Sequence, residues 1–146
     1  MTLGAGRRPA GFMRRMASGL YELLILLALV FIATLPFSYV FGDATQGWKR
    51  LLLQAWVLVV TAAYFGWFWT HGGQTLPMKT WRFKLVRVDG GAITWPRALR
   101  RFGLAAVGFL AAGLGFLWAL VDRDRQFLHD RLAGTALVDA TTTAQG

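Results

Sequence analysis

The feature that most constrains this chain is a set of three segments, each 19 or 20 residues long, that contain no charged side chain. They run from Leu23 to Phe41, from Leu51 to Thr70 and from Phe102 to Val121. A helix rises about 1.5 Å per residue, so each segment crosses most of a hydrocarbon core that is roughly 30 Å thick. We therefore predict an all-α integral membrane protein with transmembrane segments at about residues 20–41, 51–70 and 102–121.

The composition agrees with a membrane location. Charged residues make up 16% of the 146 residues and hydrophobic residues 55%, whereas soluble domains carry about 25% charged residues. The net charge is +9, but the basic residues lie between the apolar segments and do not suggest the basic face of a soluble nucleic-acid binder. We expect the bilayer, with its anionic head groups, to be the partner.

The membrane domain is predicted to cover residues 13–139, between a disordered basic arm at residues 1–12 and a disordered tail at residues 140–146. Residues 71–101 form the longest connection and are expected to lie on the membrane surface. Cysteine is absent from the sequence, so disulfides and thiolate chemistry are excluded.

A small β-hairpin is predicted within this connection. Residues 80–88 alternate between apolar and polar side chains, Asp89-Gly90-Gly91 is a typical turn, and residues 92–95 supply the second strand. Pro96 fits the first turn of a helix that begins near Arg97.

The distribution of Lys and Arg predicts the orientation. With three crossings, the arm and residues 71–101 share one side and carry 11 basic residues, against 5 on the other side. The positive-inside rule then makes the N-terminus cytoplasmic and puts the tail outside. The alternative is a break at Gly113-Leu114-Gly115 that turns the third segment into a shallow hairpin and returns the tail to the cytoplasmic side.

The third segment is also rich in small residues, with Gly108 and Ala112 forming one small-xxx-small pair. Such pairs let helices approach closely in lipid, and plain helix packing is the favoured explanation. Because three helices hardly enclose a polar path, a homo-oligomer is expected if the protein transports a solute.

Two ionisable side chains at the start of the first segment attract attention. Arg15 and Glu22 are seven residues apart, so they share one stripe of a helix. A carboxylate drawn toward lipid must pair, reach the head groups or face protein or water. Glu22 is therefore either a site for a cation or proton, or an interfacial carboxylate neutralised by a neighbouring arginine.

The remaining motifs give no sign of an enzyme. No H-E-x-x-H, G-x-S-x-G, P-loop or G-x-G-x-x-G pattern occurs, and His129 beside Asp130 alone is not a metal site. We predict no catalytic residue, no metal and no cofactor. Five basic residues of the central connection are assigned to lipid head groups: Lys79, Arg82, Lys84, Arg100 and Arg101.

Four motifs resemble those of a known family. They are Arg14-Arg15-Met16-Ala17-Ser18 leading to Tyr21-Glu22, then residues 64–69 (YFGWFW), residues 72–79 (GGQTLPMK) and residues 128–135 (LHDRLAGT). Together they resemble the RDD family of bacterial membrane proteins, which is named for one arginine and two aspartates. The resemblance covers about Arg14 to Val138.

This resemblance implies roles for three residues. Arg15 corresponds to the family arginine, Asp130 to its second aspartate, and Glu22 stands where the first aspartate is expected. Pro77 stands where a glycine is common. The family's molecular role is largely undefined, although transport has been proposed and cation/proton exchange is attributed to some members.

The expected function is that of a multi-pass inner-membrane protein that transports small cations or protons, with Arg15, Glu22 and Asp130 as its ion or proton site. The alternative is a non-catalytic interaction or assembly protein in which the same triad only locks helix ends. A joint role for the triad requires Asp130 on the side of Arg15, which favours the broken third segment.

Overall fold

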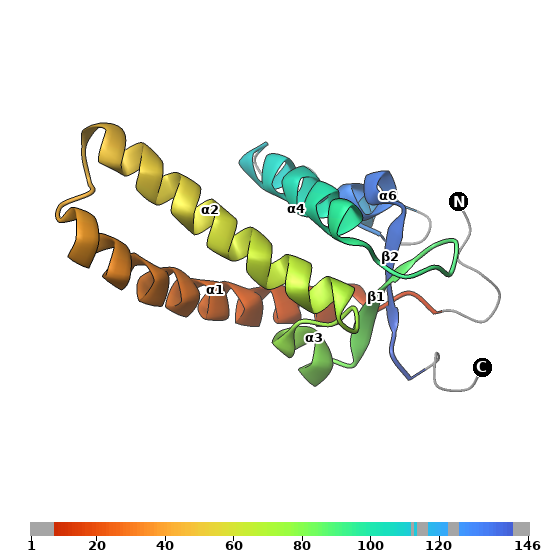
Figure 1. The fold of residues 1–146 in the computed structure, drawn as a ribbon. Coiled ribbons are helices and arrows are strands. Elements are labelled where there is room, and N and C mark those ends of the chain that lie inside the picture. The colour runs from red at the N-terminus through yellow and green to blue at the C-terminus, as the bar shows by residue number, and fades with distance from the viewer. Residues whose placement is uncertain (1–7, 112, 114–116, 123–125, 142–146) are drawn as a thin grey trace.

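The computed structural model describes residues 8–111, 113, 117–122 and 126–141. Its helices and strands follow one another along the chain as α1 (Phe12–Phe41), α2 (Gly47–Thr70), α3 (Leu76–Thr80), β1 (Phe83–Arg87), α4 (Trp95–Leu110), the short 3-10 helix η1 (Trp118–Leu120), α6 (Leu128–Ala133) and β2 (Thr135–Asp139). Figure 1 shows a long helical hairpin, α1 and α2, with α4 beside α2 and the strands gathered at one end.

The hairpin contains two helices that are long and apolar enough to cross a membrane. The helices α1 and α2 have 30 and 24 residues, and most of their large apolar side chains, such as Leu27 and Phe31, point outward. An apolar surface of this extent would be unfavourable in water but is suited to lipid. The indole N–H of Trp56 donates to the carbonyl of Ala33 at 2.9 Å and joins the two helices.

The prediction of a single transmembrane helix over residues 102–121 is wrong. The helix α4 begins at Trp95 and ends at Leu110, and Gly113 adopts a φ of +76° that interrupts the helix. Glycine has low helix propensity and readily takes positive φ values. The structure therefore shows no third transmembrane helix in its described residues, while residues 114 and 115 of the predicted break lie outside them.

The predicted β-hairpin is also wrong, because β1 pairs with the distant strand β2. The pairing is antiparallel and runs from Phe83 opposite Asp139 to Arg87 opposite Thr135. Phe83 and Leu85 turn inward as the alternation predicts, and the largely buried strand β2 offers them a better inner face than residues 92–95. The Asp89 turn is confirmed, and Pro96 occupies the first turn of α4.

The tail lies on the same side as the N-terminal arm. The Ala10 N–H donates to the Leu137 carbonyl at 3.1 Å, and Arg14 forms an ion pair with Asp139 at 3.0 Å. A two-stranded sheet with these contacts cannot have one strand on each side of a bilayer, so the prediction that the tail and the arm lie on opposite sides is wrong. Residues 8–12 are ordered, contrary to prediction, while residues 1–7 and 142–146 lie outside the described part.

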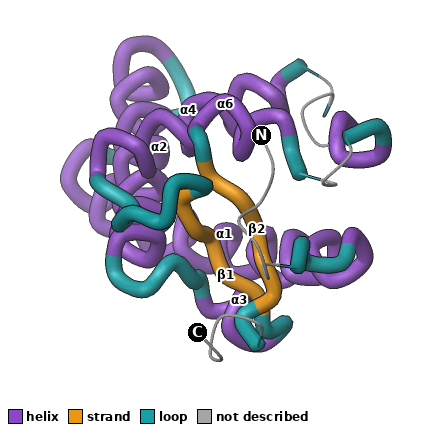
Figure 2. The backbone as a smooth tube through the Cα atoms, turned by 90° about the vertical axis from the view of Figure 1, so that its right-hand side faces the viewer, coloured by secondary structure: helices purple, strands orange, loops and turns teal. Residues whose placement is uncertain are grey.

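The buried core lies where the hairpin meets the sheet. Figure 2 looks onto this end and shows the two strands surrounded by the ends of the helices. The side chains of the core come from segments far apart in the sequence: Ala10, Trp69, Met78, Phe83, Leu85, Ala98, Phe127 and Leu137. This core holds the polar residues described below in place.

Candidate functional site

A cavity of about 430 Å³ lies between the hairpin, α4 and the sheet end of the protein. Toward the hairpin its walls are apolar, with Leu23, Leu26 and Phe109 among them. Toward the sheet, polar side chains lie among apolar ones such as Phe83 and Leu137. The polar side chains that line it are Arg15, Ser18, Glu22, Thr61, Thr75, Arg101 and His129.

The Glu22 carboxylate is held by two hydroxyl groups from different parts of the chain. Tyr64 of α2 donates to Oε1 at 2.7 Å, and Thr75, directly before α3, donates to Oε2 at 2.6 Å. Thr75 is fully buried. Within the described residues Glu22 forms no ion pair, so neutral donors satisfy its oxygens without cancelling its charge.

Asp130 forms a buried ion pair with Arg101. Its Oδ1 accepts from Nε and lies 2.6 Å from a terminal nitrogen of Arg101, and both side chains are almost completely buried. The Arg101 guanidinium also stacks over the Trp69 ring, 4.2 Å from its centroid. The assignment of Arg101 to lipid head groups is therefore wrong, because this arginine turns into the core toward a distant aspartate.

Arg15 is buried in the same cavity, with only 3% of its surface exposed. Its guanidinium lies over the Phe127 ring, 4.8 Å from the centroid. The structure thus brings Arg15 and Glu22 to one cavity, as their seven-residue spacing predicts. Asp130 stands behind the cavity wall, where it binds the Arg101 that lines it.

His129 is a buried, uncharged member of this cluster. Its ring stacks on Phe127 with centroids 5.3 Å apart, and its Nε2 lies 3.8 Å from Asp130. Burial lowers the pKa of the His129 imidazole to about 4, with Asp130 opposing the shift and Arg101 adding to it. The ring is therefore neutral near pH 7.

The buried histidine makes stability depend on pH. Because its folded-state pKa of about 4 lies below the ordinary value of 6.5, the unfolded chain binds the proton more readily. Stability is lost as pH falls from 6.5 toward 4, by about 2 kcal/mol at pH 5. Denaturant titrations in detergent micelles at pH 7 and pH 5 should show this loss in the parent and a smaller one in His129→Gln. Equal losses would contradict the assignment.

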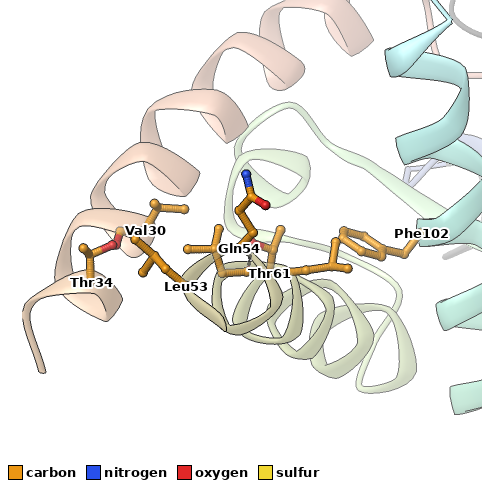
Figure 3. A pocket seen from close by; sticks show the side chains of 8 residues that line it. Val30, Thr34, Leu53, Gln54, Thr61 and Phe102 are labelled. Atoms are coloured by element: carbon orange, nitrogen blue, oxygen red, sulfur yellow. Dashed lines mark hydrogen bonds between the residues drawn. The ribbon is translucent and has the colours of Figure 1, made fainter. Parts of the chain in front are cut away.

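A groove continues from the cavity along the hairpin. It has a volume of about 380 Å³ and shares Thr61 and Phe102 with the cavity. Figure 3 shows α2 as its floor, with Val30 and Thr34 of α1 on one side and Phe102 of α4 on the other. The Gln54 amide stands up from α2 between them.

Sequence reasoning missed four residues of the site: Tyr64, Thr75, Arg101 and His129. Tyr64 had the pattern of an interfacial aromatic residue, and Arg101 that of a basic residue beside a membrane segment. Thr75 lies within the GGQTLPMK motif, which is a signal that could have pointed to it. The other residues assigned to head groups remain at least partly exposed, and that contact stays a prediction: Lys79, Arg82, Lys84 and Arg100.

The residues of this cavity fall within a segment that matches a known protein family. The model of the RDD family matches residues 9–134, which include nearly all residues of the cavity. The chain belongs to the RDD family. Together with the two long apolar helices, this membership supports a membrane protein.

One relative of this RDD protein is an uncharacterized protein of Rickettsia prowazekii. The two are 30% identical over 90 residues, which is 61% of this chain and 50% of the relative. The chain thus spans about half the length of that curated relative. No solved structure matches this RDD protein.

Proposed function

We propose that this RDD protein is a transport module for small cations or protons in the bacterial inner membrane. One observation carries the proposal: the Glu22 carboxylate, directly before the uncharged segment of α1, lines a cavity and is held by two neutral hydroxyl groups. A carboxylate in such a place is suited to take up and release a positive charge.

The proposed orientation has the sheet and both ends of the chain in the cytoplasm. Of the sixteen Lys and Arg residues in the sequence, two lie beside the short connection between α1 and α2: Lys49 and Arg50, in the first turn of α2. With α1 and α2 as the two crossings, the positive-inside rule supports a cytoplasmic N-terminus. Without a third crossing in the described residues, the basic residues of the tail count toward the cytoplasmic side, which increases the difference in Lys and Arg between the two sides.

The neighbours of Glu22 favour a proton or a monovalent cation as the transported species. No group of three acidic or histidine side chains suited to a metal ion occurs in the described parts of the chain. Arg15 and Arg101 line the same cavity and raise its electrostatic potential, which disfavours a multivalent cation. Tyr64 and Thr75 would orient the carboxylate, and Asp130 would hold Arg101 in position.

A second copy of the chain would complete the transport path. Two helices alone cannot enclose a polar route, and Gln54, which lines the groove, is exposed. An amide in hydrocarbon gains from a hydrogen bond across helices. We therefore retain a homo-oligomer as part of the proposed function.

The test is ion flux in vesicles that contain the purified protein. With a monovalent cation gradient and an internal pH dye, the parent should move protons, and Glu22→Gln should abolish most of this flux because its amide does not titrate. Asp43→Asn is the matched control, since Asp43 lies in the exposed connection of the hairpin and should leave flux unchanged. Equal flux in the parent and Glu22→Gln would exclude the carboxylate as the ion site.

A second function is favoured by the way these residues join separate elements. Glu22 connects α1 with α2 and the residue before α3, and the Asp130 pair connects α4 with α6. The same contacts suit an interaction or assembly protein whose polar residues lock helix ends. Flux no greater than that of empty vesicles in the parent protein would favour this function.

A further inference from the structure

A second charged pocket, of about 310 Å³, lies between α4, α6 and the turn after β1. It shares no lining residue with the cavity around Glu22. Three arginines from two helices line it, Arg97 and Arg100 from α4 and Arg131 from α6, with a single acidic residue, Asp89.

Two acidic groups beside this pocket, Asp89 and Asp122, have basic partners. Asp89 pairs with Arg87 and accepts the Gly91 N–H at 3.2 Å, while Asp122 pairs with Arg131. Arg97 and Arg100 form no ion pair in the portion of the chain that the structure describes. The residues that line the pocket carry three positive charges and one negative charge, and this surplus of two positive charges favours an anionic ligand.

The helix α4 places the pocket level with the end of the apolar segment of α2. The Trp95 ring packs so closely on Gly66 that a β-carbon there would lie 2.3 Å from it. Gly66 is close to the end of α2, where the membrane-spanning segment gives way to the loop. The two arginines that follow Trp95 therefore stand at the depth of lipid head groups.

Exposed apolar side chains follow the arginines along α4 toward its C-terminal end. Arg97, Arg100 and Val107 are separated by three and seven residues, so they follow one face of α4. Val107 is 65% exposed, and Leu110 at the end of the helix is also exposed. This face is cationic at the head-group end and apolar toward the membrane interior. It therefore complements a phospholipid with an anionic head group and apolar acyl chains.

We propose that this pocket binds the phosphate group of an anionic phospholipid, whose acyl chains lie against Val107 and Leu110. Guanidinium groups bind phosphate oxygens through paired hydrogen bonds, and Arg131 is already oriented by Asp122. The exposed apolar side chains of α4 favour a lipid over a soluble phosphate compound. The proposal needs the membrane location but not the ion flux assigned to Glu22.

The chain contains no cysteine, so a single reporter can be introduced at Val107→Cys and labelled with a fluorophore. The labelled protein is placed in phosphatidylcholine vesicles that contain phosphatidylglycerol with brominated acyl chains, which quench the fluorophore on contact. Brominated phosphatidylcholine at the same mole fraction measures contact with bulk lipid. The parent should be quenched several-fold more efficiently by the anionic lipid.

The paired substitution Arg97→Gln with Arg100→Gln should remove this preference. Lys49→Gln with Arg50→Gln removes the same charge at the start of α2 and should keep it. Absence of a preference in the parent, or equal loss in both double variants, would overturn a specific site. Displacement of the anionic lipid by an excess of inorganic phosphate would also overturn the proposal, since it would identify a site for soluble anions. Unchanged thermal unfolding of each variant excludes a folding defect.

Discussion

Replacing Asp130 by asparagine is expected to destabilise the folded protein by about 3–5 kcal/mol, because it leaves the buried Arg101 guanidinium without its counter-charge. Asp130 is completely buried, and the Arg101 side chain retains only 7% exposure. The amide can accept one hydrogen bond but cannot compensate a cation removed from water. Denaturant unfolding in detergent micelles, followed by tryptophan fluorescence, measures the change.

Two variants separate the buried pair from a general charge effect. Asp139→Asn breaks the partly exposed pair with Arg14 and should cost less than about 1 kcal/mol. Replacing Asp130 and Arg101 together by leucine should cost less than Asp130→Asn alone, because no charge is then left buried. A cost for Asp130→Asn no larger than that for Asp139→Asn would contradict the ion pair as described.

The substitution Gly73→Ala is expected to destabilise the protein by about 3–5 kcal/mol, since left-handed backbone strain adds to a steric clash. Gly73 has a φ of +72°, and a β-carbon on it would lie 2.4 Å from the Leu85 carbonyl oxygen. That oxygen belongs to the backbone of β1 and cannot move aside cheaply. The Gly73 carbonyl also accepts the Leu85 N–H at 2.7 Å, so the clash disturbs this contact as well.

Its neighbour provides the control. Gly72 also has a positive φ, of +115°, but a β-carbon there would meet no atom within 4 Å. Gly72→Ala should therefore show only the strain, about 1–3 kcal/mol. The Gly73 variant should also weaken the proposed ion flux, because Gly73 lies two residues before the Thr75 hydroxyl that holds Glu22. Equal unfolding free energies for the two variants would exclude the close approach to β1.

Local patterns predicted the elements whose formation depends on nearby residues. The helices α1 and α2 follow from long uncharged segments, the turn at Asp89 from its glycines, and the start of α4 from Pro96. The seven-residue spacing of Arg15 and Glu22 predicted that they share a helix face, and both line one cavity. The order of residues 8–12 was not predicted, since it depends on a contact between Ala10 and Leu137 that spans nearly the whole chain.

The sequence by itself determined the two apolar helices of the hairpin and membership of the RDD family, since hydrophobicity, helical period and motifs are properties of neighbouring residues. The tertiary structure alone decided that β1 pairs with β2 and that Arg101 turns inward to Asp130. Each of these depends on which distant segments offer a complementary surface, a choice that packing and the burial of charge make only once the chain has folded.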